Sequence, residues 1–169
     1  MPPDRHQQLT ELYDLHYAGL CRLAAHLLCS TAQAEEVVQE AFLRTFAGWA
    51  RIRQPERASW YLRTTVVNLC RSRMRRRTTE DRGNRTVWAS ARDVEWPGEH
   101  SEDVAAVLDA VRALPQRQRE AVVLRYYEDL AEADIARILH CSTGTVKSQL
   151  SKARATLAGL LTLSLSEEP

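Results

Sequence analysis

One face of the segment 142–157 carries short polar and cationic side chains and no acidic side chain. The apolar residues of this segment repeat at helical spacing and form one stripe: Val146, Leu150, Ala153 and Leu157. The polar and cationic residues outside that stripe that could face DNA are Thr143, Lys147, Ser148, Ser151, Lys152 and Arg154. Cations bind backbone phosphates, and short polar groups allow a helix to approach base edges closely. The pattern therefore indicates a helix that contacts duplex DNA.

The residues just before this segment support that interpretation. A short amphipathic stretch, 131–138, is followed by a three-residue break at Leu139-His140-Cys141, and Ser142 or Thr143 then opens the next helix. Two short helices separated by such a turn are typical of a helix-turn-helix, whose second helix enters the major groove. The alternative is an ordinary amphipathic surface helix.

A second cationic surface lies in the first half of the chain. Residues 58–79 include six arginines and no acidic residue. The residues that could contact DNA are Asn68, Arg71, Ser72 and Arg75, which share a helix face, and the following Arg76 and Arg77. An amide can read a base edge while arginines hold phosphates, which suits single-stranded as well as duplex DNA. The alternative is a solvated helix end, where cations also favour the macrodipole.

Helical periodicity predicts an all-α fold of two small helical domains. The first domain has three helices along 9–27, 31–49 and 55–77. Ser30 and Gln33 form a capping-box pattern before the second helix, and Pro55 suits the start of the third. The second domain has four helices, beginning after Ser101 with the stripe Val104, Val107 or Leu108, and Val111. The predicted boundaries are 1–77, a flexible linker 78–103, and 104–169.

The net charge of +1 over 169 residues conceals an uneven distribution. Residues 1–77 have a net charge of +5, residues 78–105 of −4 and residues 106–169 of zero. The acidic stretch lacks periodicity and holds Trp88 and Trp96, which either dock on a partner surface or pack on the adjacent domains. A nearly neutral chain is not expected to coat DNA by itself, so its DNA contacts should depend on a partner.

Other function classes find little support in the composition. No segment has the roughly 18 apolar residues of a membrane span, and the N-terminus has no signal-peptide pattern, so we expect a cytoplasmic protein without membrane insertion. The residues that could bind a metal, His16, Cys21, His26 and Cys29, point in at least three directions on one helix. We therefore expect no metal and no cofactor. Neither a nucleophile–base pair nor a phosphate loop is present, so no enzymatic activity is expected.

The chain resembles a known family in two places. AEEVVQEAFLRTF (34–46) and WYLRTTVVN (60–68) resemble domain 2 of bacterial extracytoplasmic-function sigma factors, which belong to the sigma-70 family. LPQRQREAVVLRYYEDL (114–130) and ADIARILHCSTGTVKSQLSKARATL (133–157) resemble their domain 4. The resemblance implies an RNA polymerase sigma factor, with domain 2 on the β′ clamp helices and the −10 element, and domain 4 at the β flap and the −35 element. It also implies an anti-sigma factor as a partner.

The resemblance assigns roles to individual residues. Glu36, Gln39 and Glu40 match the surface that binds core polymerase, and Asn68 matches the pocket for a flipped −10 base. The arginines that follow Asn68 would contact the DNA backbone, and the residues of 143–154 given above would face the −35 element. The alternative function is a helix-turn-helix repressor that binds DNA without core polymerase.

Three residues depart from the family pattern. Ala131 replaces the usual Ser or Thr at the start of the first turn-motif helix, so Asp129 is the expected helix cap instead. His140 replaces the usual Gly of the inter-helix turn, which would be strained if a positive φ is needed there. Ser151 replaces a bulky or basic residue, so the −35 sequence preference does not transfer from the family.

Overall fold

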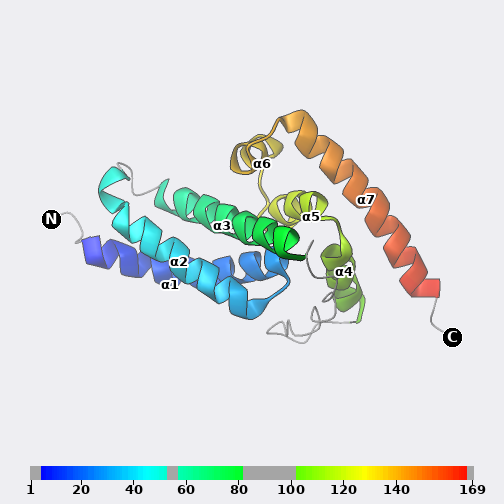
Figure 1. The fold of residues 1–169 in the computed structure, drawn as a ribbon, viewed down its shortest axis with the longest axis horizontal. Coiled ribbons are helices and arrows are strands. Elements are labelled where there is room, and N and C mark those ends of the chain that lie inside the picture. The colour runs from blue at the N-terminus through cyan, green and yellow to red at the C-terminus, as the bar shows by residue number, and fades with distance from the viewer. Residues whose placement is uncertain (1–4, 53–56, 82–101, 167–169) are drawn as a thin grey trace. The chain divides into compact units, whose positions relative to one another are not determined.

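The computed structural model describes residues 5–52, 57–81 and 102–166. Intrachain contacts divide the chain into two compact units, residues 1–94 and 95–169. The described residues of both units form helices, with no strand among them (Figure 1). The prediction of an all-α fold is confirmed.

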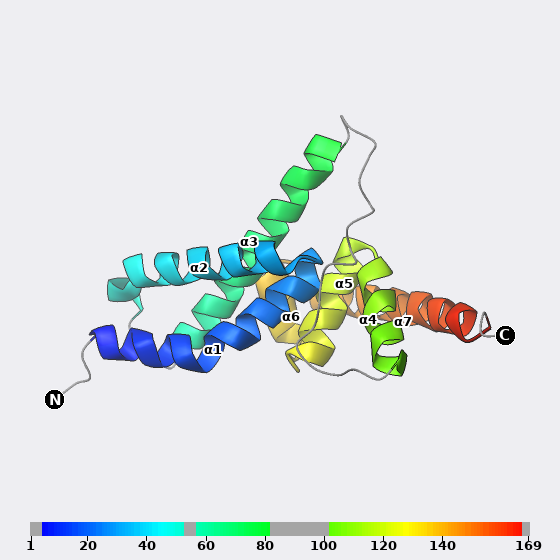
Figure 2. The same cartoon turned by 90° about the horizontal axis from the view of Figure 1, so that it is seen from below.

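The first unit is a three-helix bundle in which each helix packs against the other two. Its helices are α1 (Arg5–Leu28), α2 (Thr31–Ala47) and α3 (Ala58–Asp81), with a 3₁₀ turn, Trp49–Arg51, after α2. The core consists of fully buried aliphatic side chains: Leu23, Leu27, Val37, Val38, Leu62, Val66 and Val67. Figure 2 shows that the C-terminal end of α3 extends past the α1–α2 pair, which exposes its basic residues.

Residues 29 and 30 separate α1 from α2, and the sequence predicts the N-cap of α2 at this junction. Cys29 adopts a left-handed conformation, with φ of 54°, and its N–H bonds the Ala25 carbonyl, which ends α1. The Ser30 hydroxyl then accepts the N–H of Gln33 at 3.4 Å as the N-cap of α2. The predicted N-cap is confirmed. Pro55, by contrast, lies outside the described residues, and α3 begins at Ala58.

The second unit is built around the long helix α7 (Thr143–Ser166). The other helices are α4 (Glu102–Ala113), α5 (Gln116–Val122) and α6 (Glu132–Leu139), with a π-helical turn, η3 (Val123–Tyr127), after α5. Leu124, Ile135, Ile138 and Leu150 form the centre of the core. The predicted α4 stripe is wrong for Val104 and Val107, which are exposed because α4 packs mainly through Ala110.

Helix ends differ from the predicted domain boundaries by a few residues. Helix α3 continues to Asp81 and α4 begins at Glu102, so both ends of the predicted linker 78–103 are helical. Helix α7 continues to Ser166, one and a half to two turns beyond the expected end near Gly159. Trp88 and Trp96 lie outside the described residues, and the role of this segment stays a prediction.

Candidate functional surfaces

The turn between α6 and α7 has the geometry that the sequence pattern predicts. His140 has φ of 53° and ψ of 48°, in the left-handed region, so its position does require a positive φ. The adjacent Cys141 N–H bonds the Ala136 carbonyl at 3.0 Å, and the Ser142 hydroxyl accepts the Thr145 N–H at 3.1 Å. These bonds close α6 and open α7, which fixes the turn.

The start of α6 differs from the expectation. Its N-cap is Ala131, which makes no side-chain cap bond, so the proposed cap by Asp129 is wrong. Asp129 instead adopts a left-handed conformation, with φ of 50°, and the following Leu130 N–H bonds the Leu124 carbonyl at 3.1 Å. Asp129 is therefore part of the turn that ends η3.

The left-handed conformation of His140 leads to a stability prediction. A residue with a Cβ pays about 1–2 kcal/mol in this region, whereas glycine does not. We expect His140→Gly to have a free energy of unfolding about 1 kcal/mol higher than His140→Ala, measured by urea denaturation. The alanine variant is the control because it removes the imidazole but keeps the Cβ. Equal stability of the two variants would contradict the prediction.

The predicted DNA-facing residues of α7 all lie on the exposed side of the helix: Thr143, Lys147, Ser148, Ser151, Lys152 and Arg154. On the opposite side, Val146, Leu150 and Ala153 are buried, while Leu157 is half-buried. Two of the cations have polar neighbours on other elements. Lys147 Nζ lies 3.9 Å from Glu132 Oε2, and Arg154 Nε donates to Tyr126 Oη at 3.1 Å.

The predicted basic face of α3 is arranged in two parts. Asn68, Arg71 and Ser72 are half-buried, and the three arginines Arg75, Arg76 and Arg77 are exposed near the end of the helix. The opposite side packs into the bundle through Val66, Val67, Cys70 and Met74. Trp60, near the start of α3, is half-buried.

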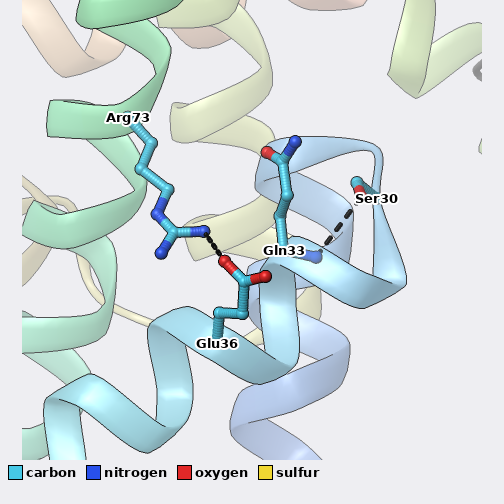
Figure 3. A network of polar contacts seen from close by, with 4 residues as sticks. All are labelled: Ser30, Gln33, Glu36 and Arg73. Carbon is cyan, nitrogen blue, oxygen red and sulfur yellow. Dashed lines mark hydrogen bonds and ion pairs between the residues drawn. The ribbon is translucent and has the colours of Figure 1, made fainter.

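The polar face of α2 consists of Glu36, Gln39 and Glu40, which lie one turn apart. Glu36 Oε2 accepts a bond from Arg73 Nη1 of α3 at 2.7 Å (Figure 3), and Glu40 Oε1 accepts one from Arg44 Nη2 at 2.6 Å. Leu43 continues this face and is 70% exposed. Sequence reasoning missed Leu43, although its spacing of i+3 from Glu40 and i+4 from Gln39 was a usable signal.

Gln39 also contacts a half-buried polar pair on α1, Tyr17 and Cys21. Its side chain is hydrogen-bonded with the Tyr17 hydroxyl, which is in turn hydrogen-bonded with the Cys21 thiol. Burial raises the pKa of Tyr17 to about 12, with a smaller contribution from Cys21, and burial also raises the pKa of Cys21. Because the thiolate is the nucleophilic form, a raised pKa makes Cys21 an inert thiol at neutral pH. The four cysteines, all within the described residues, are not joined in disulfides.

An open hollow of about 610 Å³ lies beside the α6–α7 turn and is lined by Ala133, Ala136, Arg137, His140, Cys141 and Thr143. It belongs to the helix-turn-helix.

Among the described helices, none has the length and apolar character to cross a membrane.

Comparisons with known proteins assign these surfaces to a family. The family model described as "Sigma-70 region 2" matches residues 12–80, and "Sigma-70, region 4" matches residues 105–157. The RNA polymerase sigma-E factor of Streptomyces coelicolor is 33% identical over 82% of this chain and 77% of its own length. The ECF RNA polymerase sigma factor SigM of Mycobacterium tuberculosis is 34% identical over 89% and 76%.

The chain belongs to the extracytoplasmic-function RNA polymerase sigma factors.

A solved structure agrees with this membership. This sigma factor is similar to RpoE of Bartonella quintana, solved in complex with the anti-sigma factor NepR, with a TM-score of 0.77 and 27% identity over 90% of this chain and 96% of that one. CnrH, solved with the cytosolic domain of CnrY, shares the fold with a TM-score of 0.63 and 21% identity over 92% and 88%. The alternative of a free-standing repressor is not favoured, because this chain matches both sigma-70 regions and its relatives are named RNA polymerase sigma factors.

Proposed function

We propose that this sigma factor directs core RNA polymerase to promoters through three separate surfaces. The observation that carries the proposal is that one chain of the sigma-70 family presents an acidic, polar face on α2 and two cationic faces, on α3 and α7. The acidic face suits a basic protein surface, and the cationic faces suit DNA phosphates.

The α2 face, with Glu36, Gln39 and Glu40, is the proposed contact with the β′ clamp helices of core polymerase. Its two carboxylates accept bonds from Arg73 and Arg44 at the protein surface. Such exposed ion pairs contribute only about 0.2–1 kcal/mol each, so a basic partner can replace the intramolecular cations. The exposed Leu43 adds an apolar group to the same face.

The α3 face is the proposed −10 contact. Half-buried Asn68 would receive a flipped base, and the exposed arginines after it would hold the neighbouring phosphates. The second unit would sit at the β flap, where α7 enters the major groove of the −35 element with Ser148 and Ser151 toward the bases and Lys147 and Lys152 toward the phosphates.

Three further points follow from family membership. We infer that an anti-sigma factor binds this protein and holds it inactive; the Bartonella quintana relative was solved in complex with an anti-sigma factor. We place the protein in the cytoplasm, where polymerase and DNA are located. We also infer that this sigma factor has no catalytic site of its own, because the polymerase carries out the chemistry of RNA synthesis.

Run-off transcription tests the proposed function. The full chain is mixed with bacterial core polymerase and a genomic promoter library, and transcripts are sequenced from their 5′ ends. We expect initiation at a set of promoters that share −10 and −35 elements and that core polymerase alone does not use. Tight promoter binding by the free protein without initiation would support the repressor alternative instead.

A further inference from the structure

The side chain of Arg154 is bonded to a residue outside the helix-turn-helix. Its Nε donates to the hydroxyl of Tyr126 at 3.1 Å, although 28 positions separate the two residues in the sequence. Arg154 is exposed on the flank of α7, and Tyr126 is 59% exposed on η3. The bond therefore lies at the surface, beside the face of α7 proposed to meet DNA.

Tyr126 stands on a turn that is closely held. Val123 and Leu124 anchor η3 in the core, and the Val123 and Leu124 carbonyls accept the N–H groups of Glu128 and Leu130 at 3.2 and 3.1 Å. Arg125 Nη1 also donates to the Leu130 carbonyl at 2.9 Å. A π turn includes one extra residue and is frequent at functional sites. The bonds around η3 hold the backbone from which the Tyr126 side chain projects.

The backbone of Arg154 is held as well. Ala153 is fully buried, and Thr156 Oγ1 is bonded to Gln118 Oε1 of α5 at 3.3 Å, within one turn of Arg154. These contacts do not restrict the rotation of the long Arg154 side chain. An acceptor at Nε removes much of that freedom, and it leaves the four N–H groups on Nη1 and Nη2 for another ligand. Two parallel N–H donors match two oxygens of one phosphate.

We propose that Tyr126 is a positioning residue that presents the guanidinium of Arg154 to a backbone phosphate of the −35 DNA. A phosphate is the ligand, rather than a base, because Arg154 lies on the flank of α7, whereas Ser148 and Ser151 lie nearer the centre of its exposed face. The inference rests on the proposed function, in which α7 enters the major groove.

Tyr126→Phe tests the inference, with Tyr127→Phe as the matched control. Each variant loses one hydroxyl from an exposed tyrosine of η3. Promoter binding by the complex of each full-length protein with core polymerase is measured by fluorescence anisotropy over a series of salt concentrations. Two DNAs are compared, one with an intact and one with a scrambled −35 element. We expect Tyr126→Phe to weaken binding to the intact promoter by about three- to tenfold and to flatten the salt dependence. Tyr127→Phe should stay within about twofold of the original protein.

A double-mutant cycle separates positioning from a structural role. Lysine has no Nε–H, so Tyr126→Phe should cause no further loss in an Arg154→Lys background, and the thermal unfolding midpoint should not change. The inference would be overturned if Tyr126→Phe and the original protein bound the promoter with equal affinity. It would also be overturned if Tyr126→Phe weakened promoter binding as much in the Arg154→Lys background as in the original protein. If the original protein shows no preference for the intact −35 element, the proposed function itself fails, and that outcome is visible before the variants are compared.

Discussion

The triple variant Glu36→Ala, Gln39→Ala, Glu40→Ala is expected to bind core RNA polymerase about 100-fold more weakly than the original protein. The three side chains form the polar face of α2, and their partner would be a basic surface. Each removed carboxylate leaves a cation of that surface without its counter-charge when the complex forms. Fluorescence anisotropy with labelled protein and purified core polymerase measures the effect.

The fold should tolerate this variant, because the three side chains lie outside the core. The ion pairs that are lost, with Arg73 and Arg44, lie at the surface and contribute about 0.2–1 kcal/mol each. A matched control is Gln7→Ala, Glu11→Ala, Asp14→Ala, which removes one amide and two carboxylates from exposed positions of α1. An equal loss of core affinity in the control would show that net charge, and not the α2 face, determines binding.

The second large effect is expected on α7. The double variant Lys147→Ala, Lys152→Ala should weaken promoter binding by the polymerase complex about 10- to 100-fold. Both ammonium groups project from the exposed side of the helix, and each would neutralise phosphate charge. Each phosphate contact releases counterions, so log K falls as log salt rises. When both contacts are lost, the slope of log K against log salt should become less negative by about 2. Salt titrations of promoter affinity measure this slope.

Arg22→Ala, Arg117→Ala is the control for the lysine variant. It removes two exposed cations, from α1 and α5, that lie outside the proposed DNA surfaces. The control should keep the affinity within about twofold of the original protein and should leave the salt slope unchanged. If the lysine variant changes affinity while its salt slope stays constant, the two lysines do not contact phosphates.

Much of the fold follows from local patterns in the sequence. The helices, the caps at Ser30 and Ser142 and the buried stripe of α7 each depend on residues within one or two turns of one another. Helical period and cap bonds act over that distance, so the sequence alone reveals them. The requirement for a positive φ at His140 is local in the same sense.

Other features depend on how the helices pack. Val104 and Val107 belong to an apolar stripe, yet the packing of α4 leaves them exposed. The π turn η3 and the left-handed Asp129 lie where α5 ends beside the core. No short sequence pattern predicted either of them.

For this sigma factor, the sequence by itself determined which residues form the acidic face of α2 and the cationic faces of α3 and α7. Only the tertiary structure decided which of these residues have partners: Glu36 is bonded to Arg73, and Arg154 to Tyr126. The physical reason is range. A side chain's face on its own helix follows from a fixed angle per residue, whereas a hydrogen bond requires two atoms within about 3 Å of each other. Residues 37 or 28 positions apart meet that requirement only once helix packing has placed them.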